Sequence, residues 1–103
     1  MAMTIKPTTQ PTTGTSFFSQ TITATYNQLV KVFGEPTWDY SDDGKVSSEW
    51  ELELEDGTVF TIYDWKENIP PCTLPDTSFT WHIGSFGPLS SEQHCTILET
   101  VNQ

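Results

Sequence analysis

The segment Tyr63-Asp64-Trp65-Lys66 brings two aromatic rings and a cation close together. Side chains two residues apart in a strand project from the same face, so Tyr63 and Trp65 would lie side by side. Two neighbouring rings give a surface on which a nucleobase, a sugar or a partner's side chain can stack. Lys66 would then meet a phosphate or pair with a glutamate. The alternative is that both rings cover a second apolar cluster or a subunit interface.

The segment Trp81-His82-Ile83-Gly84 holds the second group of candidate residues. Alternation along a strand places Trp81 on one face and His82 on the other. An imidazole can donate or accept a hydrogen bond near neutral pH, which suits His82 to a polar ligand. The alternative is a purely structural hydrogen bond. The predicted ligand-binding residues are Tyr63, Trp65, Lys66, Trp81 and His82.

The other reactive side chains form no catalytic or metal-binding pattern. Cys72, Cys95, His82 and His94 would have to converge from scattered positions to bind a metal, and their spacing does not indicate this. Nothing marks either thiol as an activated nucleophile. Glutamates on an exposed strand face stay ionised, whereas a general acid needs burial or a partner that shifts its pKa. We therefore expect no catalytic residue, no metal and no cofactor, and a binding protein rather than an enzyme.

Acidic residues dominate the charge of this 103-residue chain. The formal net charge is −10, with four lysines and no arginine, so direct binding to a DNA or RNA backbone is not expected. Eleven of the 14 acids lie between residues 35 and 67. Their simplest role is a solvated face, and the alternative is an acidic surface that docks on a basic protein.

The sequence predicts no signal peptide and no membrane span. Two free thiols in a reducing cytoplasm are expected, and one disulfide is the alternative.

Residues 50–66 predict the β-hairpin that would position the first candidate group. Trp50, Leu52 and Leu54 alternate with glutamates, as in a strand with one dry face and one wet face. Asp56-Gly57 is a strong turn signal between two such strands. The hairpin therefore decides which aromatic rings reach solvent.

Two pairing registers are compatible with this hairpin. A two-residue turn would place Tyr63 and Trp65 on the apolar face. A three-residue loop over 55–57, with Gly57 left-handed in a bulge, shifts the pairing by one residue and turns both rings outward. We prefer the second register because it buries Phe60 and Ile62 and leaves the carboxylates in water. It also places three glutamates on the outward face, and these are the residues expected to bind a basic partner in the alternative function: Glu49, Glu51 and Glu53.

The rest of the chain predicts a small α+β domain. Residues 1–16 are rich in threonine and proline and are expected to form a flexible arm, which a neighbouring subunit would hold. Residues 17–103 would form a single domain, beginning with a strand over 17–24 whose Phe18 and Ile22 point inward. A further strand is expected over 79–83.

Two capping boxes predict the helix starts, at Thr25-Tyr26-Asn27-Gln28 and at Ser90-Ser91-Glu92-Gln93. The first helix should end at Gly34, a typical residue just past a helix, with Pro36 two residues beyond it. The expected order is β-α-β-β-β-α, with two helices packed on one face of a mainly antiparallel sheet.

Three motifs resemble a family of small proteins encoded by tailed bacteriophages and some bacteria. They are Phe33-Gly34-Glu35-Pro36, Asp56-Gly57-Thr58 followed by Thr61-Ile62-Tyr63, and Trp81-His82-Ile83-Gly84. Ser85 stands where the family pattern has a second glycine. The resemblance implies a phage setting and raises the expectation of a role against host defence, without supplying a mechanism.

These observations predict a non-enzymatic, homo-oligomeric binder that sequesters a small nucleotide-derived signal in the host cytoplasm. The first alternative is an acidic inhibitor that imitates nucleic acid and docks on a basic host protein. The second is a virion accessory protein that uses the arm of residues 1–16 to tie subunits together. The third is an enzyme that acts on a nucleotide signal, with His82 as the acid–base group.

Overall fold

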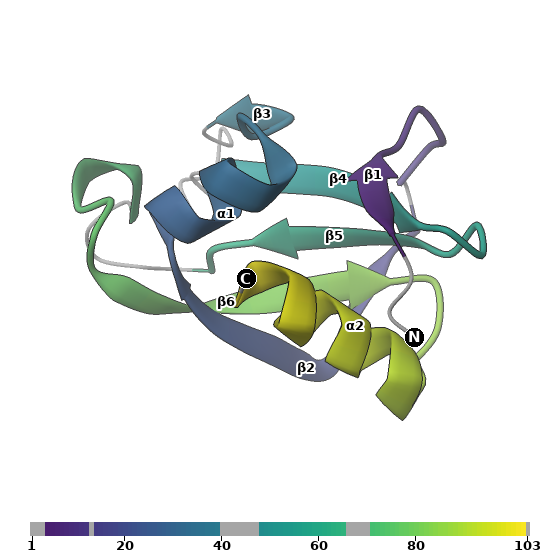
Figure 1. The fold of residues 1–103 in the computed structure, drawn as a ribbon. Helices are drawn as coiled ribbons and strands as arrows, with labels where there is room; N and C mark the ends of the chain where they lie inside the picture. The colour runs from purple at the N-terminus through teal and green to yellow at the C-terminus, as the bar shows by residue number, and fades with distance from the viewer. Residues whose placement is uncertain (1–3, 13, 40–47, 66–70, 103) are drawn as a thin grey trace.

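The computed structural model describes residues 4–12, 14–39, 48–65 and 71–102. Within these ranges six strands form one antiparallel sheet, and two α-helices lie on one side of it (Figure 1). The elements in chain order are β1 (Ile5–Pro7), β2 (Ser16–Thr25), α1 (Tyr26–Phe33), β3 (Trp38–Asp39), β4 (Ser48–Leu54), β5 (Val59–Tyr63), the 3-10 helix η1 (Pro71–Thr73), β6 (Ser78–Ser85) and α2 (Ser91–Val101).

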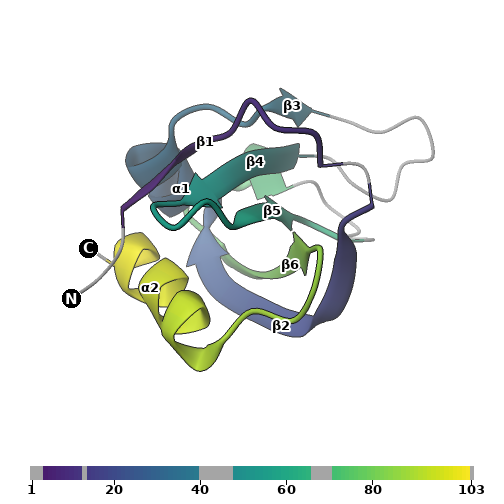
Figure 2. The ribbon, with the colours of Figure 1, turned by 90° about the vertical axis from the view of Figure 1, so that its right-hand side faces the viewer.

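The strands lie in the order β1-β4-β5-β6-β2, and β3 also pairs with β4. Figure 2 shows that the sheet is curved, with β2 and β6 sweeping round below β5. The expected α+β class with an antiparallel sheet is confirmed. None of the helices in the described part of the chain is long and apolar enough to cross a membrane.

The hydrophobic core lies between the sheet and the two helices. Buried side chains alternate with half-buried ones along β4, as the period of a strand requires. In β5 and β6 the residues between core positions are also buried in part, and Thr61 and Ser85 are examples. The core consists of Ile22, Ala24, Leu29, Phe33, Trp50, Leu52, Leu54, Phe60, Ile62, Trp81, Ile83, Leu89, Ile97 and Val101.

Both helices begin at the predicted capping boxes. The Thr25 hydroxyl accepts a hydrogen bond from the Gln28 amide at 3.0 Å, and the Gln28 side chain accepts one from the Thr25 amide at 2.8 Å. Ser90 and Gln93 repeat this exchange at 3.1 and 2.8 Å. These reciprocal bonds satisfy amides that lack a partner inside the helix. α1 ends at Gly34, as predicted.

The hairpin adopts the three-residue register. Trp50 pairs with Ile62 and Glu49 pairs with Tyr63. The Gly57 amide donates to the Leu54 carbonyl at 2.8 Å, and Gly57 has a φ of 91°, a left-handed conformation that glycine adopts without strain. Tyr63 therefore projects from the face of the sheet opposite to the core.

Residues 1–16 do not form a separate arm in the described part of the chain. β1 pairs antiparallel with β4, with Ile5 opposite Leu54. The Thr8 amide then donates to the Glu51 carbonyl at 3.1 Å. The low hydrophobicity of this segment indicated disorder, but the free edge of β4 satisfies its backbone groups, which composition does not reveal.

The inward position predicted for Phe18 is wrong. Phe18 is 37 % exposed, whereas Ile22 is buried as expected. The pairing of β2 with β6 is irregular between Phe17 and Thr21, where Ser19 has a φ of 66°. β2 advances by four residues from Phe17 to Thr21 while β6 covers only two, from Gly84 to His82, so the extra residues interrupt the pairing, and a strict two-residue period does not predict where the side chains in the irregular part point.

Candidate functional site

Four rings gather on the face of the sheet that the helices leave uncovered. We name Phe17, Tyr63, Trp65 and His82 the outer aromatic cluster. The rings of Phe17 and His82 stack, with centroids 4.0 Å apart and planes inclined by 10°. The His82 and Trp65 centroids are 6.2 Å apart and their planes are inclined by 21°. Tyr63 meets both Trp65 and His82 edge to face, at 6.3 and 5.6 Å.

Strand pairing brings these rings together. Tyr63 of β5 lies opposite His82 of β6 in the register, so their side chains share one face. Phe17 of β2 pairs with Gly84, two residues along β6 from His82. The bulge that follows Phe17 keeps this ring on the outer face. The cluster therefore extends across three strands and reaches the edge of the sheet.

The cluster is a surface rather than a buried core. Phe17 is 42 % exposed and Trp65 is 40 % exposed, while Tyr63 and His82 are half-buried. Folding buries large apolar rings where it can, so two such rings in water on one patch indicate a binding surface. Rings inclined at 73–80° do not form one flat platform. The faces that Phe17 and His82 turn toward each other are already in contact, so a planar ligand would stack on the exposed part of the Phe17 ring or of the Trp65 ring.

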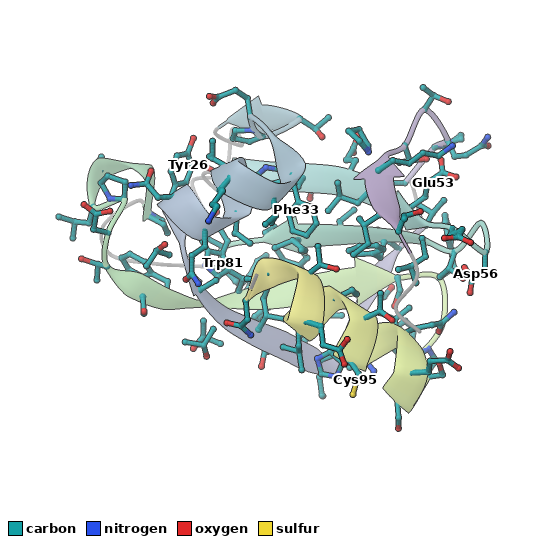
Figure 3. The ribbon with its side chains drawn as sticks, in the orientation of Figure 1. Tyr26, Phe33, Glu53, Asp56, Trp81 and Cys95 are labelled. Atoms are coloured by element: carbon teal, nitrogen blue, oxygen red, sulfur yellow. The ribbon has the colours of Figure 1, made fainter. Side chains whose placement is uncertain are left out.

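Trp81 does not belong to this surface. It is fully buried, and its indole N–H donates to the Ala24 carbonyl at 2.9 Å. Its ring packs edge to face on Trp50, with centroids 5.5 Å apart. Figure 3 shows Trp81 on the side of the sheet that carries α1 and α2. We therefore reassign Trp81 from the predicted ligand site to the core. Lys66 lies outside the described residues.

The outward glutamates of β4 lie beside the cluster and under the N-terminal segment. Glu49 pairs with Tyr63. The Thr12 hydroxyl donates to the Glu51 carboxylate at 2.7 Å, and the Thr8 hydroxyl donates to the Glu53 carboxylate at 2.8 Å. The segment around Thr8 and Thr12 therefore covers part of the acidic row that was predicted to bind a basic protein.

The pKa of the Tyr63 phenol lies above its usual value of 10.0, because burial disfavours the charged form and Glu49 adds a negative charge nearby. The pKa is higher in the folded than in the unfolded state. The resulting stabilisation is complete below pH 10 and is lost as the pH rises through the folded pKa.

We expect a phenolate absorbance titration to show one late-titrating tyrosine that disappears in Tyr63→Phe. Glu49→Gln should shift it toward 10; an unchanged titration in both variants would contradict this assignment.

A pocket of about 810 Å³ opens at the opposite end of β5 from Tyr63. It lies between the N-terminal segment, the β4–β5 turn, the loop after β6 and the first turn of α2. Its lining contains none of the cluster rings. Glu53, one of the three glutamates predicted to bind a basic partner, is among the residues that line this pocket.

The remaining candidates from the sequence are placed as follows. His94 lies with its Nε2 3.0 Å from the Thr21 carbonyl, which anchors α2 to β2. Cys95 is an exposed free thiol, and the Cys72 side chain lies outside the described residues. Where the structure describes side chains, no three metal-ligating residues lie together.

Sequence reasoning missed Phe17 and the pocket. The only sequence signal at the irregular part of β2 is a Phe17-Phe18 pair in a run without charges, and this pair does not indicate an irregularity. Phe17 was therefore assigned to neither face of the sheet. The pocket joins three parts of the chain, residues 10–11, 53–59 and 85–93, that are far apart in the sequence, and periodicity within one segment does not report it.

The sequence matches no protein-family model, and no curated protein matches it. The resemblance to small phage proteins therefore stays a prediction.

Proposed function

We propose that the protein is a non-enzymatic binder that captures the planar ring of a small nucleotide-derived molecule on the outer aromatic cluster. The observation that supports this proposal is the pair of nearly parallel contacts that His82 makes with Phe17 and Trp65. Stacking on aromatic side chains contributes about 1–3 kcal/mol per base and tolerates different bases.

The charges favour recognition of the ring over recognition of phosphates. The lysines in the described ranges are Lys6 in β1 and Lys31 in α1, and neither belongs to the cluster. A ligand with several phosphates would approach a chain with a net charge of −10. We therefore expect the tightest ligands to carry exposed bases and little negative charge per ring.

The biological setting of the proposal comes from the sequence motifs. A phage-encoded binder of a nucleotide signal would act in the host cytoplasm, where it would lower the free concentration of a defence messenger. Sequestration needs no chemistry on the ligand. Incubation with protein should therefore return the ligand intact, and a product would instead favour the enzyme alternative with His82 as acid–base group.

Binding to nucleotides is the direct test. Calorimetry against cyclic dinucleotides, cyclic trinucleotides and ADP-ribose derivatives should find a ligand that binds at micromolar concentration. Phe17→Ala and Trp65→Ala should each weaken it at least about tenfold, because each removes a stacking face. Phe18→Ala is the matched control: it removes a neighbouring, similarly exposed ring outside the cluster and should leave affinity unchanged. Absence of binding across the panel by folded protein would refute the proposal.

The structure weakens two alternatives. Thr8 and Thr12 already bond to Glu53 and Glu51, so the acidic row is less available to a basic partner than its sequence suggests. The virion accessory function depended on a free arm, and β1 pairs with β4 of the same chain.

A further inference from the structure

The 810 Å³ pocket has the size of a ligand site and is distinct from the outer aromatic cluster. Its walls come from the N-terminal segment with Pro11, from β4 and the hairpin with Glu53 and Gly57, and from the loop after β6 with Phe86, Gly87 and Pro88.

Negative charge is the main electrostatic feature of this pocket. Glu53 lines it, and Thr8 uses one acceptor site of that carboxylate, which has about four. Asp56 adjoins the lining through hydrogen bonds from the Thr58 amide at 2.9 Å and the Gln93 side chain at 3.2 Å. These bonds, those of Thr58 first, lower the pKa of Asp56, so it stays ionised at neutral pH. Figure 3 shows Glu53 and Asp56 at the same end of the sheet.

The lining of the same pocket also includes an exposed aromatic ring. Phe86 is 56 % exposed, the largest exposure among the large apolar side chains of the described chain. The backbone of the N-terminal segment approaches it so closely that a Cβ at Gly14 would lie 3.4 Å from the ring. Pro11 and Pro88 extend this apolar wall. The ring therefore lies next to the N-terminal segment while much of it remains in water.

We propose that this pocket binds the guanidinium group of an arginine side chain presented by a basic partner protein. A guanidinium is planar, stacks on an aromatic ring and donates hydrogen bonds to a carboxylate in a fixed geometry. Phe86 and Glu53 supply the ring and the carboxylate. An anionic ligand would instead meet Glu53 and a net charge of −10. This inference does not depend on the nucleotide proposal, because the two sites share no residue.

Lys6 is an internal competitor for the proposed ligand. It lies opposite Glu53 in the register of β1 and β4, so both side chains project from the same face. An ammonium at this position reduces the attraction between Glu53 and an incoming cation. Removing this charge should therefore strengthen binding, whereas a site unrelated to Glu53 would not respond.

The test uses the peptide acetyl-Gly-Arg-Gly-amide and its citrulline counterpart, which has nearly the same shape without the charge. Titration into isotope-labelled full-length protein, followed by amide NMR shifts, locates even millimolar binding. We expect the arginine peptide to shift the amides of Gly57, Phe86 and Gly87 most. The citrulline peptide should bind about tenfold more weakly, as expected for the loss of a charge-assisted contact.

Four variants decide whether the pocket itself is responsible. Glu53→Gln keeps an acceptor for Thr8 and should weaken arginine binding about tenfold, and Phe86→Ala about threefold. Lys6→Gln should strengthen it. Glu99→Gln, which removes an exposed acid elsewhere on α2, should have no effect. Shifts spread over the whole acidic surface, equal binding of citrulline, or equal effects of Glu53→Gln and Glu99→Gln would overturn the inference.

Discussion

Trp81→Ala is expected to lower the free energy of unfolding by about 3–5 kcal/mol, the usual cost of deleting a buried tryptophan. Trp81 is fully buried and packs edge to face on Trp50, and its indole N–H donates to the Ala24 carbonyl at 2.9 Å. The variant loses this packing and leaves the buried carbonyl without its donor. A domain near the lower end of the typical range, with a stability of about 5 kcal/mol, would then be partly unfolded at physiological temperature. Urea denaturation followed by circular dichroism measures the change.

Trp65→Ala is the matched control for this prediction. Trp65 is 40 % exposed and lies in the outer aromatic cluster, so its removal should cost less than about 1 kcal/mol. The pair of variants separates a core tryptophan from a surface tryptophan with the same chemical deletion. Equal losses of stability would show that Trp65 is part of the folded core and would remove the argument for a binding surface.

Gly84→Ala should destabilise the fold by about 1–3 kcal/mol, the range expected for overpacking. A Cβ at this position would lie 2.6 Å from the Thr61 hydroxyl oxygen and 3.3 Å from Cε1 of Tyr63. Thr61 is only 2 % exposed, so it has little room to move aside. The added methyl group would also push on the Tyr63 ring, and we expect ligand affinity at the cluster to fall with stability. Denaturation and calorimetry on the same variant measure both effects.

A double-mutant cycle identifies the cause of this loss. Thr61→Ala removes the oxygen that meets the new Cβ, so Gly84→Ala should cost less in the Thr61→Ala background than in the native protein. A coupling energy of about 1 kcal/mol or more in this direction would support the steric explanation. Strict additivity of the two substitutions would contradict it, because the destabilisation would then come from the backbone and not from Thr61.

The sequence determined the local elements of this protein. Both capping boxes specify a helix start through contacts within four residues, so Thr25 and Ser90 could be assigned without knowledge of the fold. The hairpin register followed from the same kind of information. Only one pairing buries Phe60 and Ile62 while keeping the β4 glutamates wet, and Gly57 supplies the left-handed residue that this pairing needs.

Tertiary structure decided which residues share a surface. Alternation predicted that Trp81 and His82 lie on opposite faces, but only the packing of the helices showed that the face of Trp81 is the core and the face of His82 is the outer one. Phe17 joins His82 only because β2 pairs with β6 and contains a bulge. β1 is ordered by the edge of β4, and its own composition does not reveal this. Short-range pattern fixes the conformation of a segment, whereas contacts between distant segments depend on the packing of the whole chain.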